Sequence, residues 1–292
     1  MRQLEGYSSI TPIAIDDTSD LREQVDQLSP GDIALFGTDR LGVPLDYIYI
    51  GLDPRDDYSE GRRNSINEVG FYDATSYCSG VPLATQPWAI KPYLTPRAAL
   101  KDIDTMRHIN SLEHPQAIRT FEPKGVIRLE NGEVAVITDF IQGVRSCDSL
   151  VDEYRETMML PEEKARLIAR TAFATMHYFH SLEEPYTMND AQIKNFAFTI
   201  NTEPWCIDTE TFQQTNKDSA KIARFVRDVG SCAYSMSGQY NYDGQRMLDP
   251  ELIIEHFIKP YEEDIPNLYS YGTVDIVQAS IEGLKQDIAQ GA

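Results

Sequence analysis

Several features are scarce or missing in this 292-residue sequence, and each absence excludes a class of protein. No apolar run approaches the roughly 18 residues that a membrane-spanning helix needs. The first residues lack the basic end and the long apolar stretch of a secretory signal. We therefore expect a cytoplasmic protein that does not associate with a membrane.

Cysteine is also scarce, with only Cys78, Cys147, Cys206 and Cys232 scattered along the chain. None of them forms a C-x-x-C pair, so no zinc site is expected. Free cysteines without a pairing pattern are typical of a reducing compartment.

Basic residues are outnumbered, because 26 Lys and Arg stand against 46 Asp and Glu and give a formal net charge of -20. Such a surface repels the phosphate backbone of nucleic acids and the anionic face of membranes. The charge balance therefore predicts no nucleic-acid partner and no membrane partner. It is compatible with a protein partner.

The chain nevertheless has the composition of a folded protein, with 41% hydrophobic and 25% charged residues. Hydrophobic periodicity and breaker residues divide it into elements. We expect helices near 19–28, 97–112, 161–181, 218–235 and 277–288, and strands at 32–36, 47–52, 88–92, 125–129, 133–140, 197–200 and 205–208. Strands thus dominate the first part and helices the second, which predicts an α+β fold.

Three polar side chains follow the long helix expected at 161–181. Asp190 lies in a polar loop, Asn195 follows five positions later, and Asp208 ends a returning strand. A hairpin brings its two ends together, so Asn195 and Asp208 can converge. Carboxylate and amide oxygens are ligands that Mg²⁺ prefers. Phosphoryl transfer requires such ligands and a carboxylate that orients the attacking hydroxyl.

This spacing resembles the catalytic loop of the protein-kinase-like superfamily, in its atypical or small-molecule branch. The resemblance implies that Asp190 is the catalytic base and that Asn195 and Asp208 hold Mg²⁺ beside ATP. It also implies a two-lobed protein-kinase-like fold with a strand-rich N-lobe and a mostly helical C-lobe. We expect an N-terminal extension at 1–64, which could form part of the N-lobe, then the N-lobe at 65–143 and the C-lobe at 144–292.

The resemblance extends to the expected N-lobe. Trp88-Ala89-Ile90-Lys91 is similar to the strand whose lysine contacts the α- and β-phosphates of ATP. No Glu falls at the place of that lysine's partner on the next helix, so Asp102 or Asp104 must serve, and we prefer Asp104. The segment Asp139, Phe140 and Ile141 resembles the hinge, whose backbone would hold adenine.

Several positions depart from the family pattern. Met188 replaces the usual His of the loop, and Thr209-Glu210 replaces the Phe-Gly after the metal-binding Asp. Gln192 stands where many protein kinases carry Lys, a role that Lys194 could take. Asp228, on the next helix, would either brace the catalytic loop through its backbone N–H groups or lie on the surface.

Two further absences bear on the reaction. Ala-Pro-Glu is missing, and only about ten residues separate Asp208 from the next helix. These features favour a small-molecule kinase of the aminoglycoside or choline type, or a compact atypical protein kinase of the RIO type. The partners would be a nucleotide and a phosphate acceptor, a small molecule or, as the less favoured choice, a protein.

Two rival readings stay open. No glycine-rich loop precedes Lys91, since Gly70 and Gly80 are the only nearby glycines. Together with Met188, this supports a pseudokinase that binds a nucleotide or a partner without catalysis. A glycosidase with two carboxylates is the other alternative.

Overall fold

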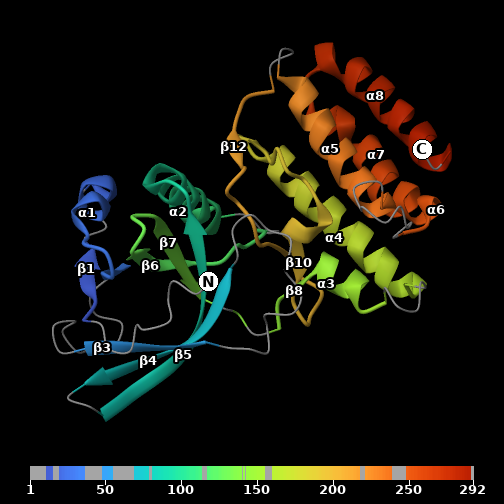
Figure 1. The fold of residues 1–292 in the computed structure, drawn as a ribbon. Coiled ribbons are helices and arrows are strands. Elements are labelled where there is room, and N and C mark those ends of the chain that lie inside the picture. The colour runs from blue at the N-terminus through green and yellow to red at the C-terminus, as the bar shows by residue number, and fades with distance from the viewer. Residues whose placement is uncertain are drawn as a thin grey trace. The chain divides into compact units, whose positions relative to one another are not determined.

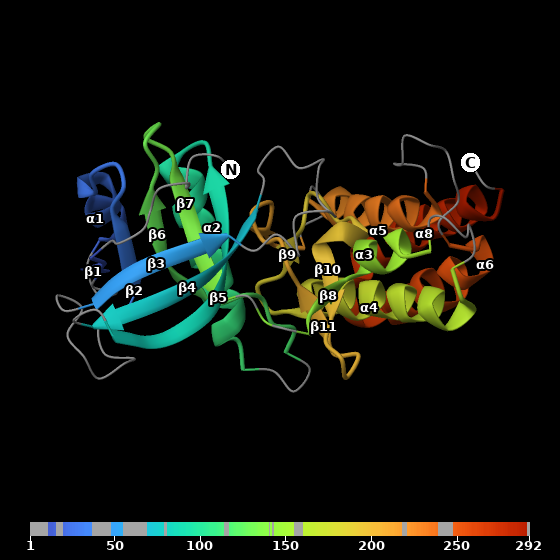
Figure 2. The same cartoon turned by 60° about the horizontal axis from the view of Figure 1, so that its bottom comes forward.

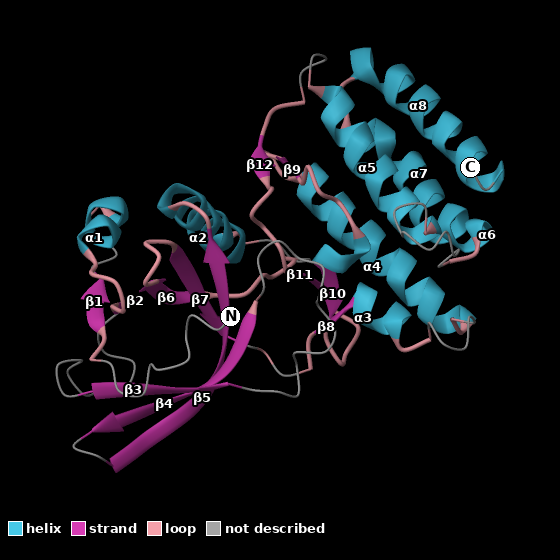
Figure 3. Ribbon diagram, in the orientation of Figure 1, coloured by secondary structure: helices cyan, strands magenta, loops and turns pink. Residues whose placement is uncertain are grey.

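The computed structural model describes residues 11–15, 20–36, 48–54, 69–78, 81–113, 117–139, 141, 143–154, 160–217, 221–238 and 248–290. The chain forms two compact units, one of Met1–Ser111 with Phe121–Gln142 and one of Leu112–Thr120 with Gly143–Ala292. The first is strand-rich and the second mostly helical, which confirms the expected α+β class (Figure 3). Each unit is described by itself.

The first unit is built on a seven-stranded sheet with the order β1-β2-β6-β7-β5-β4-β3 (Figure 1). Its strands are β1 Ile13–Ile15, β2 Ile33–Phe36, β3 Ile48–Pro54, β4 Gly70–Cys78, β5 Val81–Tyr93, β6 Pro123–Arg128 and β7 Val134–Asp139. Pairing is antiparallel except between β1 and β2. The long strands β3, β4 and β5 run side by side (Figure 2).

Alternation along the strands separates two apolar clusters on opposite faces of this sheet. On β7, Val134 and Val136 join the cluster that contains Ala99 and Ile103 of a helix, while Ala135 and Ile137 join the other cluster. The helices are α1 Leu21–Gln27 and α2 Pro96–Ser111. Burial against α1 and α2 therefore fixes which face of the sheet each residue occupies.

The predicted hairpin at Asn131-Gly132 is confirmed as the turn between β6 and β7. Gly132 has a φ of 83°, a conformation that glycine adopts without steric cost, and the Asn131 side chain accepts a hydrogen bond from the Glu133 N–H. On β6, a Cβ on Gly125 would lie 2.1 Å from the Ala34 carbonyl oxygen. Only glycine lets β6 approach β2 this closely.

The second unit is organised around α4 Glu162–Ser181. Ile168, Ala172, Met176 and Phe179 form its buried face, as the spacing predicted. The other elements are α3 Cys147–Asp152, η4 Ile193–Asn195, α5 Ile222–Ser237, α6 Pro250–Ile253, η5 Ile254–Ile258, α7 Lys259–Leu268 and α8 Tyr271–Gln290. No helix in the described ranges has the length and apolarity to cross a bilayer.

Two small sheets also belong to the second unit in the described part of the chain. One has the order β11-β10-β8, and the other pairs β12 with β9. Their strands are β8 Arg145–Ser146, β9 Tyr186–Thr187, β10 Phe196–Phe198, β11 Pro204–Cys206 and β12 Gln213–Gln214. The antiparallel pair β10–β11 is the short hairpin predicted after the long helix.

The order of these elements is the one that the family resemblance implied. A lysine-bearing strand is followed by a helix and a hairpin, the division between units falls between Gln142 and Gly143, and a helical unit with one short hairpin follows. The chain has a two-unit protein-kinase-like fold.

Candidate active site

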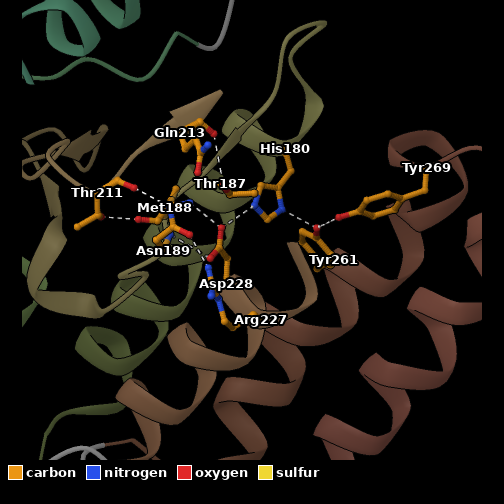
Figure 4. A network of polar contacts seen from close by, with 10 residues as sticks. All are labelled: His180, Thr187, Met188, Asn189, Thr211, Gln213, Arg227, Asp228, Tyr261 and Tyr269. Carbon is orange, nitrogen blue, oxygen red and sulfur yellow. Dashed lines mark hydrogen bonds and ion pairs between the residues drawn. The ribbon is translucent and has the colours of Figure 1, made fainter. Parts of the chain in front are cut away.

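Asp228 of α5 holds the loop that carries Asp190 through two backbone N–H groups. Asp228 Oδ2 accepts a hydrogen bond from the Met188 N–H at 2.6 Å, and its Oδ1 accepts one from the Asn189 N–H at 3.2 Å. Asp228 is 1% exposed, so its carboxylate can hardly be satisfied by water. Of the two roles considered for Asp228, the bracing role is confirmed (Figure 4).

Asn195 connects the loop to the β10–β11 hairpin. Its Nδ2 donates to the Asp190 carbonyl at 2.7 Å, and its own carbonyl accepts from the Ile207 N–H at 3.0 Å. The register of the hairpin pairs Phe196 with Cys206, so Asn195 and Ile207 form the next step toward Asp208. The structure thus brings Asp190, Asn195 and the segment of Asp208 together as the sequence predicted.

The carboxylate of Asp190 has partners on both oxygens. Oδ1 accepts from Gln192 Nε2 at 2.6 Å, and Oδ2 lies 3.2 Å from Lys194 Nζ. Asn195 Nδ2 makes a longer contact of 3.4 Å to Oδ2. With its side chain 30% exposed, Asp190 lies where a solvent-borne group can reach it.

The donor atoms near Asp208 fit a hard divalent cation. Because Asn195 Nδ2 is committed to the Asp190 carbonyl, Oδ1 is the amide atom that can face a metal. Asp208 supplies a carboxylate, of which Oδ1 accepts the Glu210 N–H at 3.2 Å. Within the described ranges, no cluster of three or more His, Cys, Asp or Glu residues could hold a metal. Mg²⁺ commonly uses one or two protein ligands together with substrate phosphates, which Asn195 and Asp208 match.

In the first unit, Lys91 points to Asp102 and not to Asp104. Lys91 Nζ lies 3.9 Å from Asp102 Oδ2, and the Tyr93 hydroxyl donates to the same oxygen. Our preference for Asp104 is therefore wrong. Residues two positions apart in a helix lie about 200° apart around its axis, so Asp102 is buried against the sheet while Asp104 is exposed. The helical spacing from Ala99 to Asp102 could have identified the correct residue.

The hinge prediction is only partly within the described residues. Asp139 ends β7, its side chain lies 2.7 Å from Lys124 Nζ, and its N–H donates to the Glu122 carbonyl at 3.4 Å. That N–H is therefore engaged within the first unit. Ile141 is half-buried, and Phe140 lies outside the described residues. Gly70 is the first residue of β4 and pairs with Ile90, so it belongs to a strand and not to a loop.

Sequence reasoning missed a buried polar chain behind Asp228. His180, at the end of α4, has its Nδ1 2.6 Å from the Tyr261 hydroxyl, which contacts the Tyr269 hydroxyl in turn (Figure 4). Burial lowers the pKa of His180, and it raises the pKa of Tyr261 well above its ordinary value. Residues so far apart in sequence carry no local signal of such a contact.

Comparison with known proteins gives likeness in structure only. No family model and no curated protein sequence matches the chain. A solved structure of WaaP in complex with acyl carrier protein aligns with 92% of this chain and 94% of its own, at 12% identity and a TM-score of 0.40. The pseudokinase domain of BIR2, an immune regulator of the RLK/Pelle family, aligns with 93% of this chain and 86% of its own, at 11% identity and a TM-score of 0.44. The protein-kinase-like fold assigned to this chain rests on its own element order and loop contacts.

Proposed function

We propose that this chain is an ATP- and Mg²⁺-dependent phosphotransferase whose acceptor is a small molecule or, as the second choice, a protein. One observation carries the proposal. Asn195 joins Asp190 to the segment of Asp208 through its side chain at 2.7 Å and its backbone at 3.0 Å. This contact supports the proposed roles, in which a base in the loop and two metal ligands at the ends of one short hairpin act together, as phosphoryl transfer requires.

In this proposal, Asp190 orients the acceptor hydroxyl and takes its proton. The hydroxyl oxygen forms a bond to the γ-phosphorus of ATP, the bond from that phosphorus to the bridging oxygen breaks, and ADP leaves. Asn195 and Asp208 would hold Mg²⁺, which supplies neutralisation of the charge on the phosphates. Lys194 provides a cation beside this carboxylate, because its Nζ lies 3.2 Å from Asp190 Oδ2.

Lys91 is proposed as the residue that contacts the α- and β-phosphates. Asp102 would position its ammonium group, because the carboxylate is buried and lies 3.9 Å from Lys91 Nζ. Adenine would be held by the backbone near 139–141. There, the Asp139 N–H already donates to Glu122, so Asp139 can offer only its carbonyl oxygen.

One observation favours the second candidate function, a pseudokinase that binds without catalysis. Both carboxylate oxygens of Asp190 are engaged, one by Gln192 and the other by Lys194. These two donors compete with an acceptor hydroxyl for the lone pairs of the carboxylate. The two functions share nucleotide binding and differ only in turnover.

The experiment that separates them measures binding and turnover on the same protein. Thermal shift with ATP and Mg²⁺ reports binding, and ADP release with a panel of small hydroxyl and amine acceptors reports transfer. We expect both signals in the wild type and binding without turnover in Asp190→Asn. Asp275→Asn, an exposed acid on α8, is the matched control. Binding without turnover for every acceptor would favour the pseudokinase, and no binding would reject both functions.

A further inference from the structure

Asn189, which precedes Asp190, makes side-chain contacts for which the proposed function has so far no use. Its φ of 57° lies in the left-handed region, which asparagine tolerates better than most residues. Its Nδ2 donates to the Thr211 carbonyl at 2.8 Å, and its Oδ1 accepts from Arg227 Nη2 (Figure 4). One side chain therefore joins the loop before Asp190, the segment after Asp208 and helix α5.

Thr211 makes a second hydrogen bond to the loop that carries Asp190. Its hydroxyl donates to the Met188 carbonyl, so Met188 and Asn189 are both bonded to the same residue. The next residue, Phe212, is 2% exposed and its ring centroid lies 5.0 Å from that of Phe179 on α4. Burial of this ring holds the segment against the helix on one side while Asn189 holds it on the other.

The rest of the segment is tied to the same loop and to α7. Gln213 and Gln214 of β12 pair with β9. The Thr215 N–H donates to the Pro185 carbonyl at 2.9 Å. Lys217 Nζ donates to the Leu268 carbonyl at 2.6 Å. Residues 211–217 are therefore held by hydrogen bonds to the loop that carries Asp190, to β9 and to α7.

We propose that Asn189 is a positioning residue that, through Thr211 and Arg227, holds Asp190 in register with Asp208. Asp228 fixes the loop from α5 through the Met188 and Asn189 N–H groups, whereas the Asn189 side chain connects the loop directly to the segment after Asp208. Alignment matters because a displacement of about 1 Å can lower a rate about 10²-fold. This inference rests on the proposed function, since it assigns Asp190 and Asp208 to one reaction.

The test compares three variants of the full chain. Asn189→Gly keeps the left-handed backbone and removes both side-chain contacts. Asn189→Asp keeps an acceptor for Arg227 but loses the donor to Thr211. Arg224→Ala is the matched control, because Arg224 lies one turn from Arg227 on α5 and contacts the segment at the Gln213 side chain, at 3.2 Å, and not at Asn189 or Thr211 in the described contacts.

Three measurements are made on each variant: MgATP binding by calorimetry, kcat and KM for ATP hydrolysis with water as the acceptor, and hydrogen exchange of residues 209–217. We expect Asn189→Gly to lower kcat by roughly 10- to 100-fold and to leave the KM for ATP within about two-fold. Exchange in the segment should become faster. Asn189→Asp should fall between Asn189→Gly and the wild type, and Arg224→Ala should match the wild type.

Two outcomes overturn the inference. One is an Asn189→Gly variant with wild-type kcat and wild-type exchange. The other is a variant that loses MgATP binding along with kcat, because that result describes a binding residue. Circular dichroism confirms that each variant is folded, and Asn189→Asp supplies the comparison if Asn189→Gly is not. A wild type that binds no MgATP overturns the proposed function instead, while exchange alone still decides whether Asn189 holds the segment.

Discussion

His180 Nε2 lies 3.7 Å from Asp228 Oδ2, and both side chains are buried. In the described part of the chain, Nε2 has no hydrogen-bond partner. The surrounding groups are Asp228 on α5, Tyr261 on α7, Lys217 in the segment after β12 and His177 on α4 itself. The loop of Asp190 thus depends on a carboxylate that faces a buried histidine.

The first prediction concerns pH. Burial lowers the folded-state pKa of His180 below the ordinary value of 6.5, with Asp228 opposing the shift. The folded state therefore binds fewer protons than the unfolded state, so His180 contributes stability above the unfolded pKa that is lost as pH falls. We expect the urea midpoint to decrease from about pH 6.5 downward, and His180→Gln to reduce that decrease.

His177→Gln is the control for this prediction, because His177 lies on the same helix and faces Asp264 near the surface. His177 has the smallest of the effects on the pKa of His180, so this variant should keep most of the His180 contribution. Equal pH profiles for wild type and His180→Gln would contradict the assignment.

The second prediction concerns the brace beneath the loop. Asp228→Ala leaves the Met188 N–H, a buried donor, and the Asn189 N–H without their acceptor. An unsatisfied buried donor costs about 1–3 kcal/mol, so we expect a loss of stability of that order or somewhat more. Urea unfolding measures it, and Asp228→Asn, which keeps one acceptor oxygen, should lose less. A variant as stable as the wild type would show that water replaces the carboxylate.

The third prediction separates the metal ligand from the base. Asp208→Ala should abolish Mg²⁺-dependent ATP binding and turnover, because charge neutralisation on phosphate is usually the larger contribution. Asp190→Ala should bind ATP almost normally and turn over about 10² to 10⁴ times more slowly. Isothermal titration with ATP and Mg²⁺ distinguishes them. Wild-type binding by Asp208→Ala would refute the metal assignment whatever the fold.

The fourth prediction uses the two aspartates of α2 as a matched pair. Asp102→Asn removes the charge 3.9 Å from Lys91 Nζ, whereas Asp104→Asn changes an exposed residue two positions away. We expect weaker ATP binding only in Asp102→Asn and in Lys91→Met. Equal affinities for the two aspartate variants would remove Asp102 from the proposed site.

Local patterns in the sequence predicted the elements well where a single period was decisive. Helical spacing in the sequence was enough to predict the buried face of α4. It was also enough to predict that of α8, which consists of Val277, Ile281, Leu284 and Ile288. Each side chain's face follows from the helical period, so no tertiary information is needed. The Asn131-Gly132 turn was predictable for a similar reason, because the turn type itself demands those residues.

Contacts between distant segments could not be predicted in this way. The sequence did not predict β1 or β4 as strands. In the structure, β1 pairs with β2 in parallel, and β4 pairs with β5 along nearly its whole length. Their pairing depends on which sheet edge is open once the other strands have packed. With three residues, β1 is too short to show a period, and β4 carries polar residues such as Asp73 and Ser76 among its apolar ones.

For the candidate site, the sequence by itself determined that Asn195 and the segment of Asp208 lie together, because a short hairpin brings its two ends together. Only the tertiary structure decided that Asp102 is the acid beside Lys91, that Asp228 braces the loop, and that Asn189 reaches Thr211 and Arg227. Each of these contacts joins separate elements. Packing brings such elements together, and the packing depends on the burial of many side chains at once.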